Sequence, residues 1–269
     1  MSRISSTYQA LKQQNRKALV TFVTAGDPDP QVTPDIMQAL VRHGADLIEL
    51  GVPFSDPMAD GPVIQRANER ALEQGVALAN VLEMVEQFRR YDSQTPVILM
   101  GYLNPVEIFG YEKFAGDAAA AGVDGVIIVD MPPEEAAVLN RHLRARDIDQ
   151  IFLVTPNTTE RRIETIAGIA SGFLYYVSVK GTTGGKQADA LEVSEKLRLV
   201  RSKTDLPLAV GFGIKDAGTA ARVAGYCDAV VIGSALVETI HTAATAGADI
   251  TAEAGSFIAP VRASLDKAA

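Results

Sequence analysis

Short apolar runs alternate with longer amphipathic segments along the whole chain. Eight of the short runs are rich in β-branched residues and leucine, which is typical of buried strands. They begin near Ala18, Asp46, Val97, Asp124, Gln150, Phe173, Pro207 and Asp228. Successive runs start about 30 residues apart on average, which is about the length of one strand–helix unit.

Helical periodicity fills the intervals between these strands. It predicts helices over residues 33–43, 133–146, 159–170 and 190–203, and an N-terminal helix over residues 4–14 before the first strand. The interval between the second and third strands is longer, with room for a loop over 52–61 and two helices, 62–74 and 78–90. Several helical segments end near a glycine that precedes the next strand, as helix C-caps prefer: Gly44, Gly122, Gly172 and Gly225.

Apolar strands that alternate with helices indicate a parallel sheet covered on both faces. Eight such units favour closure into one α/β domain, a (β/α)8 TIM barrel over residues 1–269, with the N-terminal helix at its bottom and an extra helix after the second strand. The alternative is an open doubly wound sheet. Its phosphate fingerprint is incomplete, because Gly211 and Gly213 are followed by glycine at 218 instead of 216, and Gly185-Lys186 lacks the rest of a P-loop.

Composition narrows the function classes. The chain has 25 Lys and Arg against 33 Asp and Glu, a formal net charge of −8, which argues against a broad basic surface for nucleic acid. One cysteine cannot form a disulfide framework, no Cys/His spacing suggests a metal site, and no segment has the length of a membrane span. We therefore expect a cytoplasmic protein without a bound metal.

The second strand carries the strongest candidate for chemistry. Glu49 stands in an otherwise apolar strand, and if it faces the barrel lumen, burial should raise its pKa and let it transfer protons near neutral pH. The alternative is a buried structural ion pair. Asp60 ends the following loop, where a helix N-cap or a turn aspartate is an equal alternative. For Asp27, Asp29, Asp56 and Asp130, near other strand ends, turn roles are favoured.

A second candidate feature lies at the ends of the last two strands, where barrels place phosphate sites. Gly211, Gly213 and Gly233 allow close approach of the backbone, and Ser234 can begin a short helix whose N-terminus attracts an anion. Residues 179–186 predict a loop that closes over substrate. No histidine, and no lysine within a strand, is placed for catalysis, so carboxylate acid/base chemistry on a small phosphorylated molecule remains.

Longer motifs resemble a known family. Residues 47–62 read LIELGVPFSDPMADGP and are similar to the signature of the tryptophan synthase alpha chain. The segments MGYLNP (100–105), GVDG (122–125), DMPPE (130–134), GFGI (211–214) and GSA (233–235) agree in the same order, and the likeness covers essentially the whole chain.

The resemblance implies cleavage of indole-3-glycerol phosphate to indole and glyceraldehyde 3-phosphate, without a cofactor in this chain. Glu49 would protonate indole C3 and help to remove the glycerol hydroxyl proton, whereas Asp60, with an ordinary pKa, would polarise the indole N–H. An isomerase barrel is a second enzyme hypothesis, which would not need this Glu/Asp pair. A stand-alone lyase and a non-catalytic activator of a partner chain are further alternatives.

The same resemblance implies the surroundings of the two carboxyl groups. The substrate-binding residues would be Phe22, Met100, Tyr102, Ile127, Tyr175, Thr183, Gly184, Gly211, Phe212, Gly213, Gly233 and Ser234. The partner would be a tryptophan synthase beta chain that carries pyridoxal phosphate in an α2β2 heterotetramer, facing Pro53, Asp56 and Asn104. The chain departs from the family at Val179-Lys180, where many members read Arg-Ala, which changes the loop before Thr183.

Overall fold

Eight parallel strands close into a barrel in the computed structural model, which describes residues 2–177, 190–211 and 213–267. The strand order around the barrel is the order along the chain, and β1 pairs with both β2 and β8. The strands are β1 (Ala18–Thr24), β2 (Leu47–Gly51), β3 (Val97–Gly101), β4 (Gly125–Ile128), β5 (Asp149–Val154), β6 (Leu174–Val177), β7 (Leu208–Gly211) and β8 (Ala229–Ile232).

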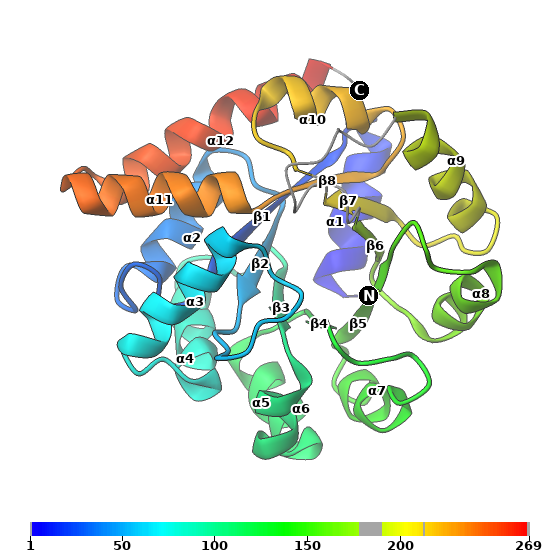
Figure 1. Ribbon diagram of the computed structural model, residues 1–269, viewed down its shortest axis with the longest axis horizontal. Helices are drawn as coiled ribbons and strands as arrows, with labels where there is room; N and C mark the ends of the chain where they lie inside the picture. The colour runs from blue at the N-terminus through cyan, green and yellow to red at the C-terminus, as the bar shows by residue number, and fades with distance from the viewer. Residues whose placement is uncertain (1, 178–189, 212, 268–269) are drawn as a thin grey trace.

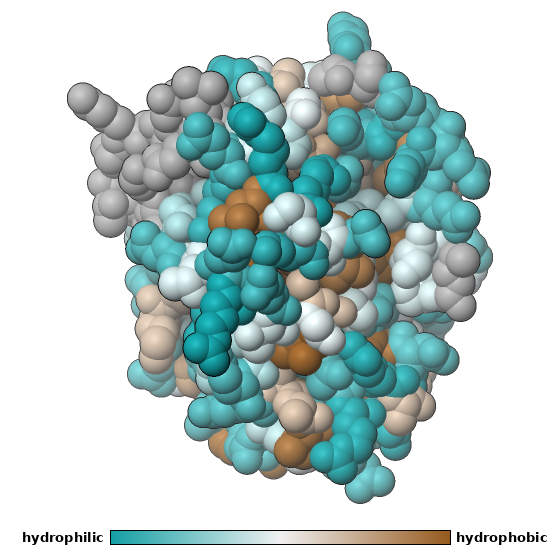
Figure 2. Space-filling model, turned by 90° about the vertical axis from the view of Figure 1, so that its right-hand side faces the viewer, coloured by the Kyte–Doolittle hydropathy of each residue, from teal (hydrophilic) through white to brown (hydrophobic). Residues whose placement is uncertain are grey.

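Helices cover the barrel, most of them as an outer ring around the strands and α1 across one end (Figure 1). They are α1 (Arg3–Gln13), α2 (Thr33–Arg42), α3 (Pro62–Glu73), α4 (Leu78–Arg89), α5 (Leu103–Phe109), α6 (Tyr111–Ala121), α7 (Ala137–Arg144), α8 (Glu160–Ile169), α9 (Ala190–Arg201), α10 (Ala217–Ala224), α11 (Ser234–Ala246) and α12 (Ile250–Lys267). The side of this ring seen in Figure 2 is mainly hydrophilic, with small separate hydrophobic patches. No helix in the described part of the chain has the length and apolar character needed to cross a membrane.

Alternation along each strand divides the core into two layers. One set of side chains, including Val20, Leu47 and Ile98, fills the lumen. The other set, including Leu19, Ile48 and Leu99, packs outward against the helices. This division decides the environment of every strand residue, because a shift of one position would exchange lumen and outer layer.

The N-terminal helix α1 closes the bottom of the barrel. Its buried residues Ile4, Tyr8 and Leu11 join the lumen cluster, and the Tyr8 ring lies 5.8 Å from the ring of Phe173 between centroids. Arg3 at the start of the helix donates to Asp124 below β4 at 2.8 Å. The lumen therefore has a floor, and its accessible end lies at the carboxyl ends of the strands.

The expected barrel is confirmed, with all eight strands where the apolar runs lie. The predicted helix over 133–146 begins later, at Ala137, because residues 133–136 form a turn. The pattern also missed α5, between β3 and α6. Gly122 caps its helix in the expected left-handed conformation, whereas Gly225 caps α10 with a right-handed φ of −65°.

Asp27 lies in a turn after β1, as expected, because its backbone N–H donates to the Thr24 carbonyl at 3.2 Å, and its side chain has a further role. Its carboxylate is buried and accepts two hydrogen bonds from the Arg70 guanidinium, at 2.7 and 2.8 Å. Gln74 also donates to the carbonyl of Gly26 at 3.4 Å. Arg70 lies in α3, and Gln74 is the C-cap residue of the same helix. These contacts therefore attach the loop after β1 to α3, the helix that follows the Asp60 loop.

Candidate active site

Glu49 lies in the barrel lumen and is fully buried, with 0% of its surface exposed. Its neighbours in register are Phe22 on β1 and Ile98 on β3, and Ile98 belongs to the lumen cluster. Neither carboxyl oxygen has a hydrogen-bond partner within the described residues, so the alternative of a structural ion pair finds no support there. Burial alone raises the pKa of Glu49 to about 8, and the group is therefore largely protonated at neutral pH.

Rings and glycines on adjoining strands shape the space above Glu49. Phe22 lies so close to Gly51 that a Cβ at this glycine would stand 2.6 Å from the Phe22 Cζ atom. Tyr175 on β6 occupies the space beside Gly211 on β7 in the same way, since a Cβ there would stand 2.2 Å from its hydroxyl oxygen. Each glycine thus lets an aromatic side chain of the neighbouring strand lie flat against the barrel wall.

Two apolar clusters meet at this end of the lumen. Ile127 and Tyr175 belong to the lumen cluster, and Phe22 belongs to a smaller cluster with residues of α3 and α11. Met100 packs against both clusters, so the structure brings these four expected substrate contacts together. Such a wall suits a flat aromatic ring.

We expect Gly51→Ala to weaken substrate binding, because the new methyl group forces the Phe22 ring toward the lumen. The KM for substrate should rise about tenfold, with a smaller change in kcat, as judged by steady-state kinetics. Gly61→Ala is the matched control, since a Cβ at Gly61 meets nothing within 4 Å. Equal KM values for the two variants would contradict this description of the pocket wall.

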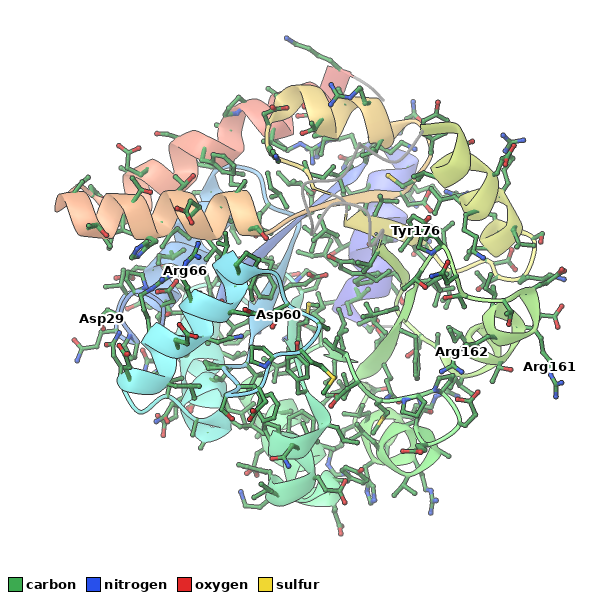
Figure 3. All side chains as sticks on the ribbon, in the orientation of Figure 1. Asp29, Asp60, Arg66, Arg161, Arg162 and Tyr176 are labelled. Atoms are coloured by element: carbon green, nitrogen blue, oxygen red, sulfur yellow. The ribbon has the colours of Figure 1, made fainter. Side chains whose placement is uncertain are left out.

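Asp60 lies on the loop between β2 and α3, and Figure 3 places it toward the centre of the molecule, whereas Arg161 and Arg162 lie at the periphery. The N-cap of α3 is Gly61, with no side-chain cap, so the N-cap alternative for Asp60 is wrong. The carboxylate instead accepts hydrogen bonds from the Tyr102 hydroxyl and from Asn68 Nδ2, the latter at 3.3 Å. Partial burial raises the pKa of Asp60, although these two hydrogen bonds oppose the rise, so the ordinary pKa expected for it is also wrong.

Tyr102 holds the Asp60 loop in place. Its hydroxyl accepts a hydrogen bond from the backbone N–H of Ala59 at 3.1 Å, and its ring stacks on Phe54 at 5.1 Å between centroids. Asn68, a residue that the sequence pattern missed, contributes from the second turn of α3 and is only 3% exposed. In sequence, a polar residue inside an amphipathic helix is expected to face solvent. Only the burial of Asn68 beside the Asp60 carboxylate identifies it as part of the site.

The end of the site that is expected to bind an anion is partly described. Gly211 ends β7, Gly213 has a left-handed φ of +48°, and Gly233 is the N-cap of α11 without a side-chain cap. Ser234 begins α11, which has 13 residues and is longer than expected. Its first-turn N–H groups and helix dipole therefore provide the kind of N-terminus at which phosphate binds.

Three expected substrate contacts, Thr183, Gly184 and Phe212, lie outside the described residues, as do Val179 and Lys180. Of the residues expected to face a partner, Asp56 and Asn104 are exposed, whereas Pro53 is buried within the chain. Asp56 accepts a hydrogen bond from the Ser55 hydroxyl at 2.6 Å, and Asn104 lies in the first turn of α5. Both exposed residues follow the carboxyl end of a strand, on the side of the barrel that carries Asp60.

The barrel is closed, and near the carboxyl ends of its strands it holds a buried carboxyl group without a partner among the described residues. These features define a (β/α)8-barrel enzyme. Comparisons with known proteins specify it further. The tryptophan synthase alpha chain family matches residues 8–264, and the chain belongs to that family, whose members cleave indole-3-glycerol phosphate to indole and glyceraldehyde 3-phosphate.

Individual relatives agree over their full length. The tryptophan synthase alpha chain of Burkholderia multivorans is 56% identical, covering 100% of this chain and 98% of its own. That of Dechloromonas aromatica is 55% identical, with 99% of each chain covered. The crystal structure of the alpha subunit from Legionella pneumophila superposes with a TM-score of 0.94 at 44% identity, again covering 99% of each chain.

Proposed function

We propose that this chain cleaves indole-3-glycerol phosphate with Glu49 as its general acid and base. The observation that carries the proposal is the Glu49 carboxyl group, which is buried among apolar side chains, has no partner within the described residues and has a pKa of about 8. Such a group holds a proton at neutral pH and can still release it, because its pKa lies near the working pH.

Glu49 returns to its starting state within one turnover. Its proton goes to indole C3, and the ring then carries a positive charge that is shared with the ring nitrogen. The Glu49 carboxylate next takes the proton of the adjacent glycerol hydroxyl. The electron pair of that O–H bond forms the C=O bond of the aldehyde. The electron pair of the C–C bond returns to the ring and neutralises its positive charge, so that indole and glyceraldehyde 3-phosphate are released.

Asp60 is proposed to hold the ring nitrogen during this cycle. Its carboxylate would accept the indole N–H, and the attraction strengthens as positive charge develops on the ring, which favours the transition state over the ground state. Tyr102 and Asn68 fix the carboxylate in position. One domain, formed by the whole barrel, supplies both carboxyl groups, the apolar wall of Phe22, Met100, Ile127 and Tyr175, and the glycine-rich ends of β7 and β8 for the phosphate.

We expect Asp60→Asn to lower kcat about 10²-fold or more, because a neutral amide stabilises a developing positive charge poorly. The assay is indole release from indole-3-glycerol phosphate by the purified chain. Asp29→Asn is the matched control, because Asp29 is exposed in another loop (Figure 3). Its side chain accepts one hydrogen bond, from the Gln31 N–H, and the oxygen of an asparagine can accept the same bond. A kcat of Asp60→Asn within a factor of three of the control would remove Asp60 from the mechanism.

The family name implies a beta chain as partner, and we propose an α2β2 complex in the cytoplasm in which pyridoxal phosphate belongs to the beta chain. The exposed Met58, 81% accessible, and Ile108, 80% accessible, follow the carboxyl ends of β2 and β3 near Asp56 and Asn104 and support an apolar contact on this side. The chain alone should release aldehyde slowly, and a beta chain should raise that rate. If aldehyde appears under neither condition, the alternative of a non-catalytic activator is favoured.

A further inference from the structure

A second pocket lies at the opposite end of the barrel from the candidate active site. It has a volume of about 470 Å³ and lies between α1 and the segments that lead into β7 and β8. Residues from α1 to Lys17 form one wall, and Arg201, Leu206 and Asp228 contribute to the other. The volume lies within the range of small-molecule sites, and no residue of the proposed reaction lines it.

The walls of this pocket carry an excess of positive charge, although the chain as a whole is acidic. Arg16 pairs with Asp266 and Arg201 pairs with Asp228, each at 2.9 Å, so these guanidinium groups are neutralised locally. Lys12 and Lys17 line the same pocket, and neither has an ion-pair partner in the described ranges. Asp205 lines the pocket as well, without an ion-pair partner among the described residues, and offsets the charge of one lysine. A net positive charge remains, which a bound anion would neutralise.

The inner wall of the pocket is apolar. Tyr8, Leu11, Leu206 and Pro207 line it, and Tyr8 is 7% exposed. The Tyr8 hydroxyl is itself buried, so a ligand in the pocket can contact only other atoms of this side chain.

We propose that this pocket binds a small aromatic anion, with its ring against Tyr8, Leu11 and Leu206 and its acidic group near Lys12 and Lys17. The ring covers the apolar wall, and the acidic group lies at the polar rim of the pocket. Tyr8 also belongs to the lumen cluster beneath Glu49, so the bound molecule contacts the floor of the barrel and leaves the open end free. Such a ligand binds together with substrate and does not compete with it.

Two fluorescent probes that differ in charge test this proposal. 1-Anilinonaphthalene-8-sulfonate is an aromatic anion, and N-phenyl-1-naphthylamine has the same rings without the sulfonate. The intact chain should bind the anion at one site at least about tenfold more tightly than the neutral probe, since tenfold corresponds to about 1.4 kcal/mol. Equal affinity for both probes would show apolar adsorption without an anion site and would overturn the proposal.

Substitutions locate the site. Lys12→Gln with Lys17→Gln should weaken binding of the sulfonate about tenfold and leave the neutral probe unchanged. Lys113→Gln is the control, because Lys113 is an exposed lysine on α6 that pairs with Asp117, away from this pocket. Gln9→Phe places a ring at the exposed, pocket-lining position of Gln9 and should weaken both probes. Unfolding temperatures of the variants within about two degrees of the original chain identify changes in binding rather than in folding.

A crystal structure of the complex with the sulfonate distinguishes this pocket from the barrel lumen. Density between Tyr8 and Leu206 supports the proposal, and density beside Phe22 and Glu49 overturns it. Kinetics provide a second distinction, because a probe in the bottom pocket leaves the KM for indole-3-glycerol phosphate unchanged, whereas a probe in the lumen raises it. Neither result depends on the activity of Glu49→Gln. The proposed binding site and the proposed mechanism are therefore tested separately, and either can be refuted without the other.

Discussion

Glu49→Gln should abolish nearly all indole formation while the chain folds normally. The amide has the size of the protonated carboxyl group and fits the same apolar surroundings, but it can neither give a proton to indole C3 nor take one from the glycerol hydroxyl. General acid–base catalysis typically contributes about 10²–10⁴-fold, and here one group serves two transfers, so we expect kcat to fall at least about 10³-fold. Indole release by the purified chain, with and without a beta chain, is the measurement.

A matched substitution separates this effect from the loss of any carboxylate. Glu86→Gln changes an exposed residue of α4 and should leave kcat within a factor of two. The KM of Glu49→Gln should also change little, since no bond from Glu49 to the ground-state substrate is needed. Turnover near that of the Glu86 variant would refute the role of Glu49, whereas a large rise in KM with normal kcat would make it a binding residue.

The pattern of apolar runs was sufficient to predict the barrel and to place Glu49 in its lumen. Periodicity places Leu47, Glu49 and Gly51 on one face, and closure of eight strands turns that face toward the lumen. Local sequence could not specify the contacts between elements distant in the chain. The local sequence identified Asp27 only as a turn residue and could not indicate its ion pair, because the partner, Arg70, is 43 positions away.

Asp60 shows the same limit. An aspartate before Gly-Pro at a helix start resembles an N-cap in every local respect. Its actual partners, Tyr102 and Asn68, come from the segment after β3 and from the interior of α3, and only closure of the barrel brings them together. The raised pKa follows from this packing and has no counterpart in the local pattern.

The second large effect concerns stability, where Glu49→Gln should be more stable than the original chain in alkaline solution. The unfolded chain ionises Glu49 near its ordinary pKa of 4.5, and the folded chain does so only near 8. Between these values the folded state binds more protons than the unfolded state, so the free energy of unfolding falls as pH rises. This contribution is fully present below about pH 4.5 and is lost as pH rises through about 8.

Comparison with Glu49→Gln isolates the contribution of Glu49 ionisation to the free energy of unfolding, because the glutamine does not titrate. Asp46 and Asp60, whose pKa values are also raised, are present in both proteins, and their contributions cancel in the difference. The two chains should unfold at similar temperatures near pH 5. At pH 9 the variant should unfold roughly 5 °C or more above the original chain, since the buried charge costs on the order of several kcal/mol.

The pH dependence of catalysis must agree with this stability difference, because both report the same ionisation. The log of kcat/KM for the original chain reflects the free enzyme, and it should fall with a slope of −1 above about pH 8 as Glu49 loses the proton needed at C3. Differential scanning calorimetry at half-unit steps from pH 5 to 9 gives the midpoint from stability, and initial rates over the same range give it from catalysis. Midpoints more than one unit apart would mean that the group controlling the rate is not Glu49, even if the variant is inactive. Coincident midpoints would show that loss of the Glu49 proton both destabilises the barrel and stops cleavage of the carbon–carbon bond. The two effects share one cause, because desolvation makes the ionised carboxylate unfavourable in the folded chain and so keeps the proton on Glu49 for transfer.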